Sequence, residues 1–352
     1  MQENLIVNDI ARFCCVCLLF FTTAGSTAQP LFNSPELLQI SLEGNISKLI
    51  KDNGIVRDWH QFRLLVDGGS LDVMLRVRGN FRRTECEFPP IMVKFNRKQV
   101  PGTLFEDQRQ LKLVTHCKRS RSYSVNIYEE YLAYRMLNEI TDRSFHVRLL
   151  QIIYQDGRRQ QSKPAFFIEP VDGLAKRIGG EHIEPDYVRS RNLDQMHLAQ
   201  SGIFQYMIGN TDFSFIAPAE GHSCCHNAKL IRVDSVIYSV PYDFDLSGMV
   251  NARYAGANPV VKTRDVRIRR YRGFCTDTLT LESALSGVRT VEAKLPALFD
   301  SATGLTEKEA RKSLRYLQGF FKTVNKSGTR VFEKSCRKPQ PAEDPGDVSA
   351  RS

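Results

Sequence analysis

Acidic residues near the middle of the chain have the types and spacing expected for metal-assisted phosphate chemistry. Asp212 ends the sequence Gly-Asn-Thr-Asp after an apolar helical segment, and Asn227 follows it by fifteen positions. Asp243 and Asp245 are one residue apart and come directly after an apolar strand. Carboxylate and amide oxygens are ligands that Mg²⁺ prefers. An Asp on a separate loop can accept a hydroxyl proton, so the set predicts phosphoryl transfer.

The elements that must position these residues can be read from the spacing of apolar residues. Alternating apolar residues indicate strands, and apolar residues at helical spacing indicate helices. The predicted strands cover residues 71–78, 91–95, 111–114, 147–154, 165–169, 229–233 and 236–240, and the predicted helices cover 126–140 and 192–208. Basic residues lie on the polar face of the first three strands, which predicts an antiparallel sheet whose polar side could line a cleft. The order of elements predicts an α+β chain with a boundary near Pro170.

The same motifs, taken in order, resemble the CotH-like (spore-coat protein H) family of atypical protein kinases. The similarity runs from Val73 to Gly248 and includes Arg78-Gly79-Asn80, the VKF sequence, the Leu-Lys-Leu strand and the Asp-Phe-Asp turn. Each motif is short, and the shared order makes the combination more specific. The resemblance implies a bilobal, protein-kinase-like fold. Its N-terminal lobe (29–169) would be an antiparallel sheet with one helix, and its C-terminal lobe (170–335) would be mainly helical.

The resemblance also assigns roles to residues of the C-terminal part. Asp212 would be the catalytic base that aligns the acceptor hydroxyl. Asp243 would bind Mg²⁺ or Mn²⁺, with Asp245 and Asn227 as further metal ligands.

For the N-terminal part, the resemblance implies a binding site for ATP. Lys112, or alternatively Lys94, would bind the phosphates together with Arg78. Glu130, or its neighbour Glu129, would fix that lysine through an ion pair. Glu169 would lie at the hinge between the lobes, beside the adenine.

The chain departs from the usual kinase pattern in three places. It has no Gly-rich phosphate loop, Asp212 and Asn227 are far apart, and Phe213 replaces the basic residue that often follows the catalytic Asp. These departures leave two alternatives open. One is a catalytically inactive structural or assembly protein of the cell envelope, and the other is a metal-dependent phosphohydrolase that uses the same carboxylates on water.

The N-terminus predicts export. Residues 13–21 are apolar but too short to span a bilayer, and small residues up to Ala28 form a plausible cleavage site, so residues 1–28 are interpreted as a signal peptide. A buried N-terminal strand or helix is the alternative. Six cysteines remain after cleavage, which predicts up to three disulfides. A zinc site at Cys224-Cys225 with His222 and His226 is the competing interpretation.

The charge composition indicates which kinds of partner the protein is expected to bind. With 49 Lys and Arg against 39 Asp and Glu, the net charge is +10, or +11 after removal of one basic and two acidic residues with the signal peptide. We therefore expect anionic partners: a nucleotide, an acidic protein or envelope acceptor, or an anionic surface touched by the basic segment Lys262–Arg272. Export and the lack of regularly interleaved aromatic residues disfavour nucleic acid. A monomer with a disordered tail (336–352) is expected.

Overall fold

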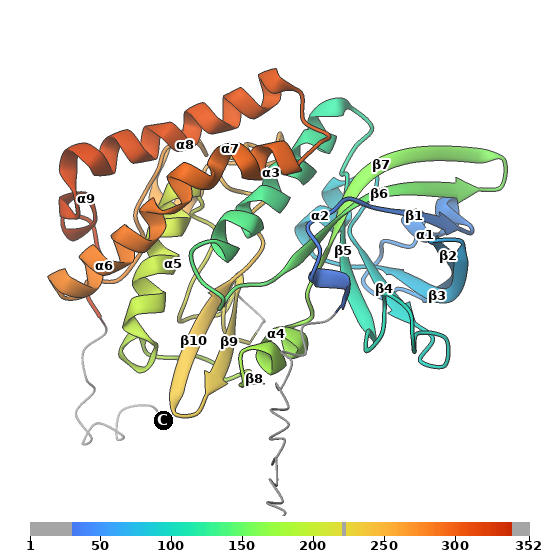
Figure 1. The fold of residues 1–352 in the computed structure, drawn as a ribbon, viewed down its shortest axis with the longest axis horizontal. Helices are drawn as coiled ribbons and strands as arrows, with labels where there is room; N and C mark the ends of the chain where they lie inside the picture. Colours follow the sequence, from blue (N-terminus) through green and yellow to red (C-terminus); the bar gives the residue numbers. More distant parts are fainter. Residues whose placement is uncertain (1–29, 220–222, 340–352) are drawn as a thin grey trace, which may run out of the picture.

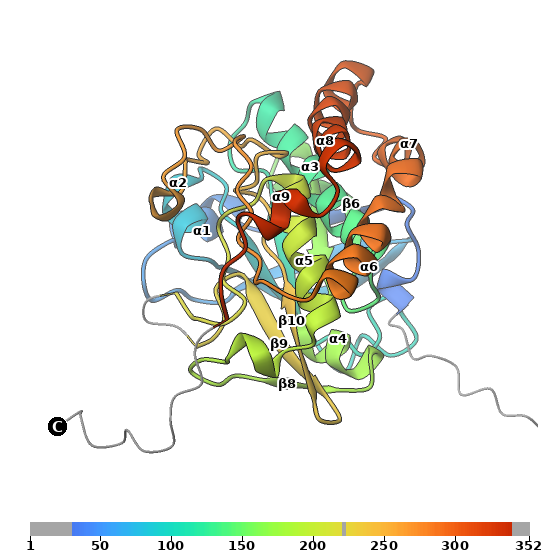
Figure 2. The same cartoon turned by 90° about the vertical axis from the view of Figure 1, so that its left-hand side faces the viewer.

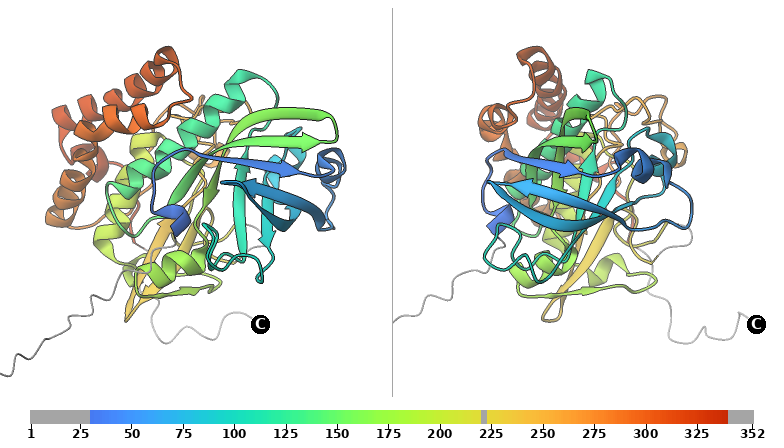
Figure 3. Two further views of the ribbon diagram at one scale, coloured as in Figure 1. Left: turned by 45° about the vertical axis from the view of Figure 1, so that its right-hand side comes forward. Right: turned by 90° about the vertical axis from the view of Figure 1, so that its right-hand side faces the viewer.

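The computed structural model describes residues 30–219 and 223–339. Seven strands close into a barrel at the N-terminal end of the chain, in the order β1-β2-β3-β4-β5-β7-β6 (Figures 1 and 3). Their bounds are β1 Leu38–Glu43, β2 His60–Val66, β3 Gly69–Val77, β4 Ile91–Phe95, β5 Gln110–Thr115, β6 Val147–Asp156 and β7 Arg159–Ile168. Neighbouring strands are antiparallel except β1 and β6, whose parallel pairing closes the barrel.

The barrel forms because alternate residues of its strands are apolar and point inward. On β3, Leu71, Val73, Leu75 and Val77 are all buried, whereas the residues between them are at least partly exposed. The β2–β3 hairpin turns at Asp67 and Gly68, which both have positive φ. Two short helices, α1 (Ile46–Lys51) and α2 (Phe81–Glu85), connect strands of the barrel.

The remainder of the chain combines helices with a second, three-stranded sheet in the order β10-β9-β8. Figure 2 looks onto this side, where α5 runs beside α6 and below α8. Its strands are β8 Glu181–Ile183, β9 Ala228–Val233 and β10 Val236–Pro241. Its helices are α4 Val171–Arg177, α5 Gln195–Ile208, α6 Thr278–Arg289, α7 Val291–Ser301, α8 Glu307–Ser327 and α9 Arg330–Glu333. Short 3₁₀ turns lie at Pro30–Phe32, Ser190–Asn192 and Pro259–Val261.

The central helix α3 (Arg121–Asn138) joins the two parts because it is buried on most of its surface. It packs against β6 and β7 on one side and α7 on the other. Local signals delimit the helices around it. Asp194 caps α5 by accepting a hydrogen bond from the N–H of His197, and Gly209 ends α5 in the left-handed conformation. Thr306 and Glu309 form a capping box at the start of α8.

The predicted fold class is wrong, although every strand and helix predicted individually coincides with an observed element. The N-terminal strands form a closed, mixed barrel instead of an antiparallel sheet lobe with one helix. The rest of the chain contains a sheet of its own, so the protein is not the bilobal, protein-kinase-like arrangement that the resemblance implied. The physical reason is the pairing of β1 with β6, two segments more than a hundred residues apart, which closes the sheet on itself.

Three disulfides connect the six described cysteines: Cys86–Cys117, Cys224–Cys225 and Cys275–Cys336. The prediction of up to three disulfides is therefore confirmed. Because Cys224 and Cys225 are bonded to each other, neither can act as the thiolate ligand of the alternative zinc site. Cys336 is held to the body, and the backbone of Arg337 pairs with Phe274, so the predicted tail is partly structured at its start. The predicted signal peptide and the rest of the tail lie outside the described residues.

Candidate functional site

A cavity of about 360 Å³ lies where the barrel meets the loops that follow α5 and β10. The barrel contributes Arg78 and Lys112, and α3 contributes Glu130. The loops contribute Asp212, His226, Asn227, Asp243 and Asp245. Seven of the nine residues that the sequence predicted for the site therefore line one cavity, although they come from segments more than a hundred positions apart.

Asp212 is held from two sides in the loop after α5. Its Oδ1 lies 2.9 Å from Nε2 of His226, and the amide of Asn227 donates to its Oδ2 (2.9 Å) and its backbone oxygen (2.7 Å). The backbone N–H of Asp212 donates to the side chain of Asn210. The hydrogen bond to Asp212 raises the pKa of His226. The carboxylate is thus oriented, with lone pairs left on both oxygens for a further donor.

These contacts bear on the predicted role of Asn227. A metal ligand would offer its amide oxygen to the ion, whereas here the amide nitrogen of Asn227 makes both hydrogen bonds to Asp212. Asn227 itself has a positive φ of 53°, which asparagine tolerates better than most residues. The geometry shows that Asn227 positions Asp212, and the predicted role of its amide oxygen as a metal ligand stays a prediction.

The loop after β10 gives its two carboxylates different environments. Asp243 is partly exposed in the cavity, and its backbone N–H donates to the hydroxyl of Tyr134. Asp245 is buried and accepts a hydrogen bond from Tyr254 (3.0 Å), with the Arg82 guanidinium 3.8 Å away. Burial, together with the charge of Asp243, raises the pKa of Asp245 to about 7. Asp243 is therefore the more available ligand for a cation.

Within residues 30–219 and 223–339, no group of three or more His, Cys, Asp or Glu side chains could hold a metal ion. At sites of phosphoryl transfer, Mg²⁺ commonly takes one or two protein carboxylates and completes its shell with phosphate oxygens and water. Asp243, with Asp245 as its neighbour, fits that donor set.

Lys112 supplies a cation close to these carboxylates. Its Nζ lies 4.7 Å from the centre of the Tyr242 ring, and no carboxylate of the described residues forms an ion pair with it. Burial lowers the pKa of Lys112 to about 8, and the charges of Arg78 and Lys229 add to this effect. Arg78 is largely buried beside Asp243, and burial lowers its pKa as well.

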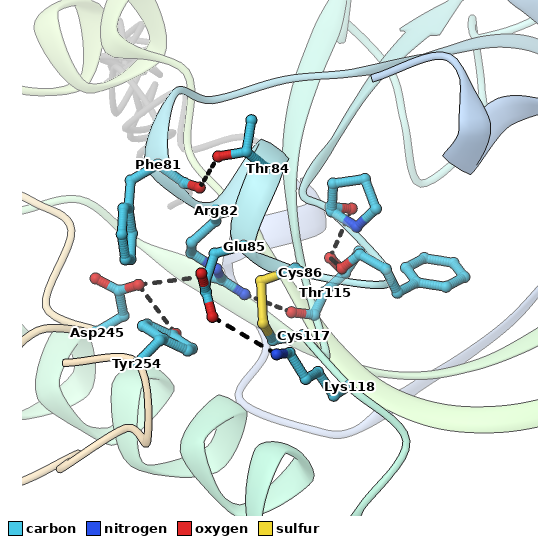
Figure 4. The surroundings of a disulfide bond; sticks show 12 residues. Phe81, Arg82, Thr84, Glu85, Cys86, Thr115, Cys117, Lys118, Asp245 and Tyr254 are labelled. Atoms are coloured by element: carbon cyan, nitrogen blue, oxygen red, sulfur yellow. Dashed lines mark hydrogen bonds and ion pairs between the residues drawn. A yellow bond between two sulfur atoms is a disulfide. The ribbon is translucent and has the colours of Figure 1, made fainter. Parts of the chain in front are cut away.

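The predicted ion pair between Glu130 and Lys112 is absent from the part of the chain that the structure describes. Glu130 instead lies 3.7 Å from the guanidinium of Arg82, which also approaches Asp245 and donates to the backbone oxygen of Thr115 (Figure 4). Burial raises the pKa of Glu130 well above its usual range. The physical reason is that α2 places a stronger, planar cation between the two buried acids, and Arg82 then serves both.

The alternative partner, Glu129, points away from this cavity. It accepts a hydrogen bond from the hydroxyl of Ser313 on α8, and burial raises its pKa to about 7.

Two other predicted site residues do not line the cavity. Lys94 lies on β4 with its Nζ 5.5 Å from the ring of Trp59, on the outside of the barrel. Glu169 is buried in a two-contact ion pair with Arg177, at 2.9 Å for each contact, and accepts from the backbone N–H of His146. The pair ties the last residue of α4 to Glu169 just before that helix, so Glu169 has a structural contact, and its predicted place beside adenine stays a prediction.

Sequence reasoning did not place three cations and a histidine in this site, although it considered His226 as a zinc ligand and Arg272 as part of a basic surface segment. Arg82, Lys229 and His226 line the cavity, and Arg272 lies beside it. Arg272 donates to the backbone oxygen of Thr211, and its guanidinium lies 5.3 Å from the ring of Phe213. It thus brings a positive charge next to Asp212, the charge that Phe213 lacks. The two adjacent arginines at positions 82 and 83, shortly after Arg78, were the sequence feature that could have indicated a role for Arg82.

Among solved structures, the chain is similar to the crystal structure of a Helicobacter pylori proinflammatory kinase, CtkA. The TM-score is 0.40 and the sequence identity 11%, over 81% of this chain and 95% of that chain. No family model and no curated protein matches the chain. A similarity of this size establishes neither the fold nor the function of this chain. The resemblance to the CotH-like family stays a prediction.

Proposed function

We propose that the cavity binds a nucleoside triphosphate, ATP in the simplest case, together with Mg²⁺ or Mn²⁺. The protein would transfer the terminal phosphoryl group to a hydroxyl group. One observation carries the proposal: an oriented carboxylate (Asp212), an available carboxylate (Asp243) and an unpaired lysine (Lys112) converge in one cavity. A buried lysine without an acidic partner lowers stability, which is expected where an anionic ligand supplies the missing charge.

Each residue then has a role in the transfer of the phosphoryl group. The acceptor oxygen forms a bond to the terminal phosphorus while the bond from that phosphorus to the bridging oxygen breaks. The hydroxyl proton passes to the carboxylate of Asp212, which His226 and Asn227 hold in place. Lys112 and Arg78 bind the phosphate oxygens, and Asp243 provides the ligand for the metal, which supplies charge neutralisation when bound.

We further propose that the protein acts after export, as a monomer, on a hydroxyl of a protein or envelope acceptor. Three disulfides support an oxidising compartment. None of the described helices is long and apolar enough to cross a membrane.

The first test is a thermal-shift titration with ATP and Mg²⁺ or Mn²⁺, followed by transfer of label from the terminal phosphate. A ligand at a hundred times its Kd should add about 2.7 kcal/mol of stability. We expect this shift in the parent and its loss in Asp243→Asn. Asp234→Asn is the matched control, because it makes the same substitution at an exposed Asp between β9 and β10, outside the cavity.

The outcomes separate the alternatives. No metal-dependent nucleotide binding in the parent would favour the structural or assembly protein. Binding followed by release of phosphate, without labelling of any acceptor, would favour the phosphohydrolase. A shift that survives in Asp243→Asn would remove Asp243 from the site.

A further inference from the structure

A second cavity, of about 320 Å³, lies between α8 and the segment that follows β10. It is lined by Arg267, Arg269, Lys312, Arg315, Tyr316 and Gly319. Four of these six residues are cationic at neutral pH, and none of the described residues that line the cavity is acidic. The cavity shares no residue with the site around Asp212 and Asp243.

The floor of the cavity is a fixed structure. Tyr316 is buried, and its hydroxyl donates to the backbone oxygen of Arg267. The guanidinium carbons of Arg267 and Arg269 lie 4.7 Å and 3.8 Å from the centre of the Tyr316 ring. Arg269 also donates to the backbone oxygens of Met207 (3.1 Å) and Tyr316 (2.6 Å), which ties it to the end of α5 and to the middle of α8. Arg269 is thus held by protein groups, and its charge stays in the cavity.

The other three cations have no acidic partner. The structure gives no ion pair for Arg267, Lys312 or Arg315 with any described residue, and Lys312 and Arg315 are exposed on one face of α8. The acids on neighbouring elements are engaged elsewhere. Their partners are the backbone N–H of Arg267 for Asp265, Arg311 for Glu307, Arg121 for Glu309 and Ser313 for Glu129.

Four like charges around one small cavity repel one another. Glu129 attracts Arg267 and Lys312 without forming an ion pair, and burial raises its pKa to about 7, so the cavity keeps an excess of positive charge. Guanidinium groups match the geometry of phosphate oxygens and can donate two parallel hydrogen bonds to them. We propose that this cavity binds a phosphate group carrying two or more negative charges, either a soluble polyphosphate or the phosphomonoester headgroup of a lipid. The proposal does not depend on the proposed catalytic function.

The test compares two double variants of the full chain. Lys312→Gln with Arg315→Gln removes two charges from the cavity, and Lys322→Gln with Lys326→Gln removes two exposed charges from the same helix outside it. Sodium tripolyphosphate is titrated into each protein by calorimetry at fixed salt. Tripolyphosphate can also enter the cavity with Asp243, so the comparison between the two variants isolates the site on α8.

We expect the cavity variant to lose about tenfold or more in affinity at one binding site, because each charge-assisted hydrogen bond is worth about that factor. The control variant should stay within about twofold of the parent, because screening weakens distant charges. Equal weakening in both variants would show binding to net charge alone and would overturn the proposal. Absence of a saturable site in the parent, for tripolyphosphate and for lipid alike, would overturn it too.

A vesicle arm distinguishes the source of the phosphate. Phosphatidylcholine vesicles with and without phosphatidic acid are sedimented with the same three proteins. Binding that requires phosphatidic acid and is lost only in the cavity variant supports a lipid headgroup. Binding of tripolyphosphate alone supports a soluble ligand.

Discussion

Replacing Lys112 by methionine should stabilise the protein and at the same time abolish nucleotide binding. The Lys112 ammonium group lies in the cavity beside Tyr242, with Arg78 and Lys229 as cationic neighbours. Burial and these charges disfavour its charged form, which lowers its pKa from the usual lysine value of 10.5 to about 8. Methionine keeps a long unbranched side chain but carries no charge, so it removes the repulsion without leaving a large void.

The magnitude follows from the pKa. A lowering from 10.5 to about 8 corresponds to at most about 3 kcal/mol of lost stability while the lysine is charged, and partial exposure makes about 1–2 kcal/mol the practical expectation. The folded-state pKa is the lower one, so the loss is complete below pH 8 and disappears as the pH rises toward 10.5. The gain in Lys112→Met should therefore be largest near neutral pH and vanish above pH 10.5.

Urea unfolding at pH 7 and pH 10.5, together with a nucleotide-binding titration at pH 7, measures both effects. Lys94→Met is the matched control, because Lys94 lies outside the cavity and its removal should change neither quantity appreciably. A loss of stability in Lys112→Met at pH 7 would show that the lysine has a stabilising partner. Unchanged nucleotide affinity would show that the ligand does not contact it.

Further substitutions test the remaining contacts of the site. Asn227→Ala should lower the rate of phosphoryl transfer about a hundredfold, because the Asp212 carboxylate is no longer held in place. The affinity for Mg²⁺ and nucleotide should stay within about twofold of the parent. A large loss of affinity in a metal titration would instead show that Asn227 is a metal ligand. Arg82→Met leaves two buried acids unpaired and should cost about 3–5 kcal/mol in urea unfolding at pH 8. The cost should be smaller at pH 5.5, where acids with raised pKa values are protonated; an equal cost at both pH values would contradict this. Cys86→Ala with Cys117→Ala opens a loop of 31 residues and should cost about 3.7 kcal/mol by chain entropy, measured as the change in unfolding free energy against the oxidised parent; a change below about 1 kcal/mol would mean that the loop is ordered without the bond.

The loops of the candidate site could be predicted from sequence because their signals are local. Gly209 ends α5 with a φ of 69°, which places the Asp212 loop directly after the helix. The alternating residues of β10 stop at Pro241, so Asp243 had to fall at the end of a strand. The role of Asn227 could not be predicted in this way, because it depends on the direction of one amide group.

The lysine of the site is a different case, because Lys94 and Lys112 have the same sequence pattern. Each is a polar residue between apolar neighbours on a short strand. The strand register separates them: Lys112 pairs with Met92 and with Ile168, which also lines the cavity, whereas Lys94 pairs with Gln110 and lies over Trp59. The ion-pair partner of Glu130 likewise could not be predicted, because Arg82 lies on α2. This helix has only five residues and shows no apolar periodicity in the sequence.

The closure of the barrel shows why correct individual elements can still give a wrong fold, since the first two strands of the barrel were not among the predicted elements. The alternation of Leu38, Ile40 and Leu42 is visible in the sequence, and so is that of the strand beginning at Val147. Neither pattern specifies that these two strands pair in parallel, because a strand with one apolar face can pair with any other strand of the same pattern. The pairing also depends on where the rest of the chain lies. Only one edge pairing separates an open sheet from a barrel. That pairing lies away from Lys112 and Arg78, on strands that contribute no residue to the cavity. The grouping of the site residues was therefore predictable even though the fold class was not.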